Sequence, residues 1–121
     1  MGMTAKEYAQ RWRHSDPLRY LLQYAKKRAK QQELEFSVSK EDFAADLPTH
    51  CPVLGCELTY SSSVQAFNSA SLDRVDPCKG YVPGNVVIVC WRVNKLKGDA
   101  SLDELSKIVA YMQGHLTTSG A

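Results

Sequence analysis

Two side chains in the C-terminal half of the sequence have the chemistry of a magnesium site. Asp73 offers a carboxylate, and Asn94, which follows it by 21 residues, offers an amide oxygen. Magnesium-like ions take oxygen ligands and keep several waters, so one carboxylate and one amide can suffice to hold them. Hydrolysis of a phosphodiester needs such a cation, a base for water, and basic groups that hold the backbone. The pair predicts this chemistry if the elements that carry the two residues bring them together.

The chain around these residues is predicted to fold as strand, long loop, strand and helix. Two apolar runs enclose a segment rich in turn-forming residues, and a helical run follows, in the order 72–75, 76–84, 86–90 and 91–97. The helix is predicted to end at Gly98. Asp73 then lies on the first strand and Asn94 on the helix.

The N-terminal part is predicted to be mainly helical. A short helix is expected over residues 3–12. Ser15-Asp16-Pro17 predicts the start of a second helix, because a capping side chain precedes proline at the first helical position. This helix has one apolar stripe, at Leu18, Leu21, Leu22, Ala25 and Ala29. A short strand over 35–38 and a brief helix that begins in a capping box at 39–42 are expected next.

The remaining segments are expected to be turns, a strand and a last helix. Residues 51–56 predict a tight turn, residues 58–60 a strand and residues 61–71 a polar loop. Ser101 and Glu104 predict the cap of the C-terminal helix. The expected buried face of that helix consists of Leu102, Leu105, Ile108, Val109 and Met112. From Gly114 onward we expect a frayed tail.

The composition is that of one ordinary globular domain. The chain has 121 residues, of which 44% are hydrophobic and 23% charged. No apolar stretch approaches the ~20 residues of a membrane span, and the N-terminus has no signal-peptide core. We therefore expect a cytosolic protein without a membrane partner. The four cysteines are then expected as thiols or metal ligands rather than disulfides, namely Cys51, Cys56, Cys78 and Cys90.

Basic residues are unevenly distributed, although the net charge is only +2. One basic group extends from Arg11 to Lys30 with a single acid, Asp16, and a second follows the apolar run 86–90. This layout fits either two patches that face a polyanion or two solvated helix faces. The residues expected to contact nucleic acid are Lys26, Lys27, Arg28, Lys30, Arg92, Lys95 and Lys97.

The sequence resembles the HNH or ββα-metal nucleases, and more closely a group of small phage-type endonucleases. The resemblance covers roughly Leu18 to Met112. It rests on segments 25–30 and 51–55 and, most specifically, on the stretch 71–97, with Ser-Leu-Asp-Arg-Val-Asp-Pro, Lys-Gly-Tyr-Val-Pro-Gly-Asn-Val and Trp-Arg-Val-Asn-Lys-Leu-Lys. It implies a divalent-metal-dependent DNA endonuclease that uses one Mg²⁺ or Mn²⁺ ion.

The resemblance also implies roles for individual residues. Asp73 and Asn94 would bind the metal ion, and Asn85 would brace the loop between the strands. Lys97 matches a lysine expected to contact phosphate. Arg74 stands where the family has the histidine that activates water. An arginine keeps its proton and cannot act as a conventional base, but it can hold a phosphate oxygen.

The general base is therefore open between three alternatives. Asp76 lies three residues after Asp73, where some of these nucleases place their base. His50 would be in reach only if the cysteine turn folds over the site. In the third alternative the ion itself activates water without a protein base. In a further interpretation, the site is slow or inactive because the motif histidine is absent.

Related nucleases often carry a structural zinc held by two Cys-x-x-Cys pairs. Cys90 occupies the first position of the second pair, but Val93 replaces its partner, and Cys51 and Cys56 are spaced more widely than in a standard pair. A zinc site would combine Cys51, Cys56 and Cys90 with His50 or Cys78. The alternative is that these cysteines are free buried thiols, which the degenerate spacing favours.

The sequence thus predicts one α+β domain with a ββα-metal, HNH-like core. Its parts are a basic helical portion, the core, a C-terminal helix and a tail, over residues 1–47, 48–100, 101–113 and 114–121. DNA is the expected partner, and the cytoplasm of a bacterial host is the expected location if the protein is of phage type. Two alternatives are a catalytically weak or inactive nucleic-acid-binding module on the same fold and a zinc-stapled domain that binds another protein. The oligomeric state is left open.

Overall fold

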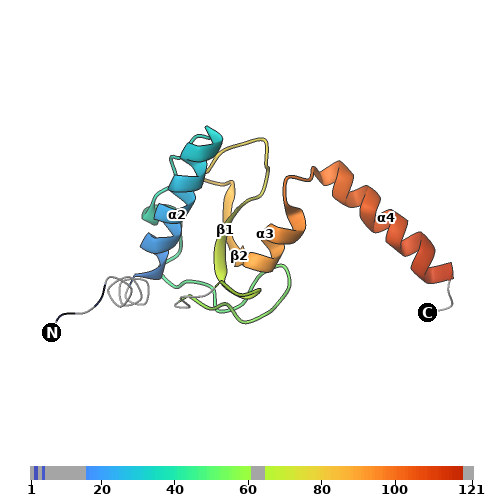
Figure 1. Cartoon of the computed structure of the whole chain (residues 1–121), viewed down its shortest axis with the longest axis horizontal. Coiled ribbons are helices and arrows are strands. Elements are labelled where there is room, and N and C mark those ends of the chain that lie inside the picture. Colours follow the sequence, from blue (N-terminus) through green and yellow to red (C-terminus); the bar gives the residue numbers. More distant parts are fainter. Residues whose placement is uncertain (1, 3, 5–15, 61–64, 119–121) are drawn as a thin grey trace.

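The computed structural model describes residues 2, 4, 16–60 and 65–118, and it has the predicted α+β class. A two-stranded antiparallel sheet lies between helices, and a further helix projects to one side (Figure 1). The elements in chain order are α2 (Pro17–Gln32), a 3₁₀ turn η1 (Lys40–Asp42), β1 (Ala70–Arg74), β2 (Val86–Cys90), α3 (Trp91–Lys97) and α4 (Leu102–Thr118). The helix expected over 3–12 lies outside the described residues.

Helix α2 begins and ends at the residues that local chemistry favours. The Asp16 carboxylate accepts the backbone N–H of Arg19 at 3.2 Å, and Pro17 occupies the first turn. The helix ends at Glu33, whose left-handed backbone (φ 57°) lets its N–H reach the carbonyls of Ala29 and Lys30. The predicted apolar stripe is buried at Leu18, Leu21, Ala25 and Ala29, and Leu22 is partly buried.

The predicted order of strand, loop, strand and helix is confirmed. β1 pairs with β2 in a register that places Ala70 opposite Cys90 and Asp73 opposite Val87. β1 covers residues 70–74 instead of the predicted 72–75. Ser69, Ala70 and Ser71, expected in a polar loop, are buried instead, because their small side chains fit closely against the core.

The two faces of β1 are covered by different helices, because successive side chains of a strand point to opposite sides. The side chain of Ser71 contacts Asn94 of α3, and Asp73 contacts Lys97 of the same helix. On the other face, the side chain of Arg74 donates to Gln32 of α2. Figure 1 shows the sheet between α2 and α3. Asp73 and Arg74 are thus directed toward different helices.

Helix α3 follows β2 without an intervening loop. Its first backbone N–H groups, those of Trp91 and Arg92, donate to the carbonyls of Ser69 and Phe67 at 2.7 and 3.0 Å. These bonds attach the start of the helix to the segment that leads into β1. The helix ends at Gly98 as predicted, where the backbone turns with φ 50°.

The segment expected as a strand over 35–38 forms only an isolated bridge between Phe36 and Tyr81. The Tyr81 N–H donates to the carbonyl of Glu35 at 2.8 Å, and the N–H groups of Ser37 and Val38 donate to the carbonyl of Tyr81. The segment 58–60 likewise forms a single bridge, between Thr59 and Ser69. Both segments therefore form single bridges to neighbouring loops instead of the predicted strands. The brief helix expected from the capping box at 39–42 to just before Leu47 is only the 3₁₀ turn η1, although its capping box is present.

Helix α4 differs most from the prediction. It continues to Thr118, beyond the predicted end at 113, and its expected buried face is exposed: Leu102 is 80%, Val109 52% and Met112 49% exposed. Leu105 alone of that face is partly covered. The apolar spacing correctly predicted an amphipathic helix, but the rest of the described chain does not cover it (Figure 1). Within the described residues, no helix combines the length and apolar character needed to cross a membrane.

Candidate metal and phosphate site

The elements described above meet at a pocket of about 150 Å³ between α2, β1 and α3. Asp73 and Asn94, the predicted metal ligands, both line it. Three positively charged side chains line the same pocket, one from each element: Arg28, Arg74 and Lys97. The other lining residues are Gln32, Leu72, Pro77, Tyr81 and Gly98.

Asp73 and Lys97 form an ion pair at the wall of the pocket. The Lys97 Nζ lies 2.6 Å from the Asp73 Oδ2, and the two side chains are only 23% and 12% exposed. Lys97 also donates to the carbonyl of Arg74 at 2.8 Å. The lysine predicted to contact phosphate is thus held against the strand. The second carboxylate oxygen of Asp73 has no part in this pair.

Asn94 is oriented by β1. Its Nδ2 donates to the Ser71 Oγ and, at 3.5 Å, to the carbonyl of Leu72. With the amide nitrogen used in this way, the Oδ1 is the atom left for a ligand. Ser71 was not among the predicted site residues. Its position two residues before Asp73, on the same face of a strand, is the sequence signal that could have found it.

Arg28 was predicted to lie with the surface lysines of α2, but its guanidinium turns inward. Its Nη2 donates to the carbonyl of Leu72 at 3.3 Å, and its Cζ lies 5.3 and 5.9 Å from the ring centroids of Tyr24 and Tyr81. Its Nε is buried and has no hydrogen-bond partner among the described residues. A buried donor without an acceptor is unfavourable, so this nitrogen is suited to receive an anionic ligand.

Arg74 is used to hold the loop between the strands. Its Nη1 donates to the carbonyls of Pro77 and Lys79 at 2.7 and 3.1 Å, and its Nη2 donates to the Gln32 Oε1 at 3.4 Å. Its Cζ also lies 5.5 Å from the ring centroid of Tyr81. Since both protons of Nη1 are engaged, Arg74 has less capacity for phosphate than the sequence suggested.

Asn85 makes the contacts expected of a residue that braces the loop. It is buried, with 6% of its surface exposed. Its Oδ1 accepts the N–H of Asp76 at 2.8 Å, and its Nδ2 donates to the carbonyls of Asp76 and Gly80 at 3.1 and 2.9 Å. One side chain thus satisfies three backbone groups of the loop and fixes the chain beyond Asp73.

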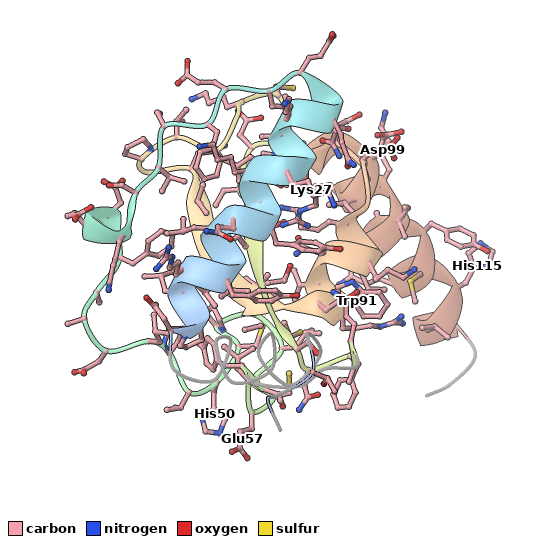
Figure 2. All side chains as sticks on the ribbon, turned by 60° about the vertical axis from the view of Figure 1, so that its left-hand side comes forward. Lys27, His50, Glu57, Trp91, Asp99 and His115 are labelled. Atoms are coloured by element: carbon pink, nitrogen blue, oxygen red, sulfur yellow. The ribbon has the colours of Figure 1, made fainter. Side chains whose placement is uncertain are left out.

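Neither predicted protein base lines the pocket. Asp76 accepts the backbone N–H of Cys78 at 2.9 Å and so closes a turn within the loop. His50 is exposed, its Nδ1 lies 2.9 Å from the Thr49 Oγ1, and it lies beside Glu57 at the edge of the molecule (Figure 2). Asp73 is the one carboxylate among the described residues that line the pocket, and no imidazole lines it.

Comparisons of the chain with protein-family models, curated proteins and solved structures found no match.

Cys51 and Cys90 lie together in the core. The Cys51 Sγ accepts the backbone N–H groups of Leu54 and Cys90 at 3.5 and 3.4 Å. Burial raises the pKa of the Cys51 thiol, but the backbone donors lower it by more. The net result is a pKa lowered from 9.0 to about 7. Burial also raises the pKa of Cys90. Of these two thiols, Cys51 is consequently the one that ionises first.

The predicted zinc ligands do not form a complete site. Cys56 is half-buried near the pair of Cys51 and Cys90, and its carbonyl accepts the N–H of Cys51 at 2.8 Å. Cys78 is exposed in the loop that follows β1. In the described part of the chain, no three His, Cys, Asp or Glu side chains are placed to hold a metal ion. A structural zinc at Cys51, Cys56 and Cys90 stays a prediction.

The other predicted DNA-contacting residues lie on the surface. Lys26, Lys27 and Lys30 are exposed on α2, where Lys27 is labelled in Figure 2. Arg92 and Lys95 are exposed on α3, where the Lys95 Nζ lies 5.0 Å from the ring centroid of Trp91. The two helices that flank the pocket therefore both carry exposed positive charge.

Proposed function

We propose that this protein is a divalent-metal-dependent DNA endonuclease with an HNH-like ββα-metal core. The observation that carries the proposal is the convergence of Asp73, Asn94 and three cations on one pocket from three different elements. Such a pocket matches the chemistry of a phosphodiester, which needs an oxygen-ligated cation and positive charges around the phosphate.

The donor set fits Mg²⁺ or Mn²⁺. A carboxylate from Asp73 and the Oδ1 of Asn94 provide two hard oxygen ligands, and these ions commonly keep waters in their other positions. When bound, the ion would stabilise negative charge on the phosphate and make a bound water more acidic. Lys97 competes for the same carboxylate, because its ammonium already lies 2.6 Å from the Asp73 Oδ2. Binding of the ion would therefore use the other oxygen of Asp73 or displace Lys97.

Arg28 is the residue best suited to hold the scissile phosphate. Arg28 lines the pocket, its buried Nε has no hydrogen-bond partner among the described residues, and a guanidinium can bond a phosphate oxygen through two donors. Arg74 and Asn85 hold the loop at the pocket's edge, so that Asp73 is presented in a fixed position. Lys97, once released from Asp73, would place its ammonium near the developing charge.

No histidine among the described residues lines the pocket, so proton transfer from water would not use one. Asp76 is engaged in its turn and His50 lies at the edge of the molecule, so neither lines the pocket with Asp73 and Asn94. Apart from Asp73, which would hold the ion, no carboxylate or imidazole among the described residues lines the pocket to take a proton. A slow enzyme is expected from this arrangement, since a positioned base typically contributes about 10²–10⁴-fold to the rate.

One observation favours a second candidate function, a nucleic-acid-binding module without catalysis. The pairing of Lys97 with Asp73 neutralises the carboxylate that the metal ion would need. If the ion cannot displace or bypass Lys97, the exposed basic residues would still bind nucleic acid. Nicking and binding must therefore be measured separately.

The test uses supercoiled plasmid with Mg²⁺ or Mn²⁺ and the full chain. We expect wild-type protein to nick it, with EDTA abolishing the reaction, and Asp73→Asn and Asn94→Ala to reduce the rate by about 100-fold or more. Asp46→Asn is the matched control, because Asp46 is an exposed carboxylate outside the pocket. If wild type and both site variants nick equally, the endonuclease proposal is wrong. DNA binding by a wild type that never nicks would favour the second candidate.

A further inference from the structure

The apolar side chains of α4 are exposed although the helix is amphipathic. Leu102, Ile108, Val109, Met112 and Leu116 are between 49% and 80% exposed. The helix stands apart from the sheet and from α2 (Figure 1), and no other described helix or strand forms a packing interface along it. A row of this size is unusual on the surface of a monomer.

The spacing of these side chains is that of a helix-pairing seam. Apolar residues alternate at intervals of three and four, at Leu102, Leu105, Val109, Met112 and Leu116. This is the a/d pattern of a heptad, in which knobs of one helix fit the holes of another. The charged residues lie away from the seam: Asp103 and Lys107 form an ion pair at 2.9 Å, and Glu104 caps the first turn.

The helix itself gives a reason to expect a partner. Nucleation of a helix is costly, and in proteins the packing of an amphipathic face supplies most helical stability. α4 has 17 residues and includes Gly114, which weakens a helix interior further. A second apolar surface is therefore needed to stabilise it.

We propose that this surface is α4 of a second copy of the chain. The residues that flank the seam are uncharged or weakly basic (Ser106, Ile108, Gln113 and His115), so two identical helices meet without charge repulsion. About half or more of each of the five exposed apolar side chains (Leu102, Ile108, Val109, Met112 and Leu116) remains to be buried, roughly 100 Å² each and about 1,000 Å² for a pair of helices. That reaches the ~1,000 Å² expected of a specific interface. A seam that matches itself is also what a twofold dimer requires.

The test measures the mass of the full chain by sedimentation or light scattering, at concentrations up to roughly 100 µM. We expect a species of twice the 13.5 kDa chain mass at the upper end. Val109→Glu should weaken the association by about 100-fold or more, since it places a carboxylate in the apolar seam. Tyr111→Glu is the matched control, because Tyr111 is 66% exposed but lies off the seam, and it should leave the dimer intact.

Far-UV circular dichroism gives a second readout. Val109→Glu should lose helical signal as its α4 frays, whereas the unfolding transition of the rest of the chain should be unchanged. Met112→Lys repeats the test with the opposite charge if Val109→Glu cannot be purified. A wild type that stays monomeric, an assembly larger than a dimer, or a dimer that both seam variants leave intact would overturn the proposal. The outcome is independent of whether the protein cuts DNA.

Discussion

Arg28 and Arg74 show how differently two arginines of one pocket can be used. The guanidinium of Arg74 is engaged with two carbonyls and Gln32, and it holds a loop. That of Arg28 donates to the carbonyl of Leu72, and its buried Nε has no acceptor among the described residues. Because both residues are arginines, the sequence did not distinguish their roles. Their hydrogen bonds give Arg28 the greater capacity for phosphate.

Arg28→Lys should reduce nicking by about 10- to 100-fold, because an ammonium keeps the charge but cannot bond through a planar fork. The measurement is the initial rate of plasmid nicking at saturating metal. Lys27→Ala, on the exposed side of the same helix, should change this rate by less than about threefold. An unchanged rate in Arg28→Lys would mean that Arg28 acts only through its positive charge.

Lys97→Met should strengthen Mn²⁺ binding by about five- to tenfold. Removal of the ammonium that lies 2.6 Å from Asp73 removes about 1 kcal/mol of repulsion toward an incoming cation. Calorimetry or the electron paramagnetic resonance of Mn²⁺ gives the dissociation constant, with Lys95→Met on the same helix as control. Weaker binding in Lys97→Met would show that the lysine supports the ion instead of competing with it.

At the scale of elements, the loop between β1 and β2 is held by close packing against the 35–38 segment. Gly80 has no space for a side chain: a Cβ there would lie 2.4 Å from the carbonyl oxygen of Glu35. The same glycine's carbonyl accepts the Asn85 amide. The loop is therefore fixed from outside by backbone and from inside by Asn85.

Gly80→Ala should lower the free energy of unfolding by about 1–3 kcal/mol, since the Glu35 backbone must shift to admit the methyl group. Urea unfolding followed by fluorescence measures this. Gly114→Ala is a useful contrast, because a Cβ at that helical position meets nothing within 4 Å and alanine favours helix. An unchanged midpoint for Gly80→Ala would contradict the packing described.

Tyr60 connects the segment 58–60 to Pro48, whose carbonyl accepts its hydroxyl at 2.6 Å. Burial raises the pKa of Tyr60 from 10.0 to about 12. The folded state thus favours the neutral phenol, and the stability linked to it is complete below pH 10 and lost as pH rises toward 12. Thermal unfolding between roughly pH 9 and pH 11.5 should show a steeper loss for wild type than for Tyr60→Phe. Parallel curves would exclude Tyr60 as the titrating group.

The sequence predicted those elements whose signals are local. Asp16 and Pro17 fix the start of α2, Gly98 ends α3, and the apolar runs around Asn85 become β1 and β2 near their expected positions. The proximity of Asp73 and Asn94 also followed from the order of these elements. Each of these features depends on residues close together in the chain.

The sequence could not predict features that depend on contacts with segments distant in the chain. An arginine at 28 has the same spacing whether it faces solvent or turns toward Leu72. An apolar stripe on a helix does not say which surface covers it, and α4 was wrongly assigned to the core of its own chain. Burial of Ser69 and Ser71 likewise depends on the elements that pack around them.

At the scale of the whole molecule, α2 and α3 both present positive charge beside the pocket. Exposed lysines and arginines of this kind bind phosphates and release counterions, so affinity for DNA should fall steeply with salt. These contacts would position the duplex without reading its sequence.

Replacing Lys26, Lys27 and Lys30 by alanine should weaken DNA binding at low salt by about 10-fold or more. It should also reduce the slope of log affinity against log salt by about 2–3, since each neutralised phosphate contributes about 0.9. Fluorescence anisotropy with a labelled duplex at several salt concentrations gives both quantities. Lys40→Ala, an exposed lysine of η1, should leave the slope nearly unchanged. A slope that does not differ between the triple variant and wild type would exclude this face of α2.

The separation of α4 from the sheet has an evolutionary consequence. Its exposed apolar side chains contribute almost nothing to the core formed by α2, the strands and α3, so mutations there carry little penalty for the pocket. Selection can therefore change α4 and the residues around Asp73 independently. Descendants of one ancestor could keep the same chemistry and differ in what they assemble with, and variation among them should be concentrated in the last turns of the chain.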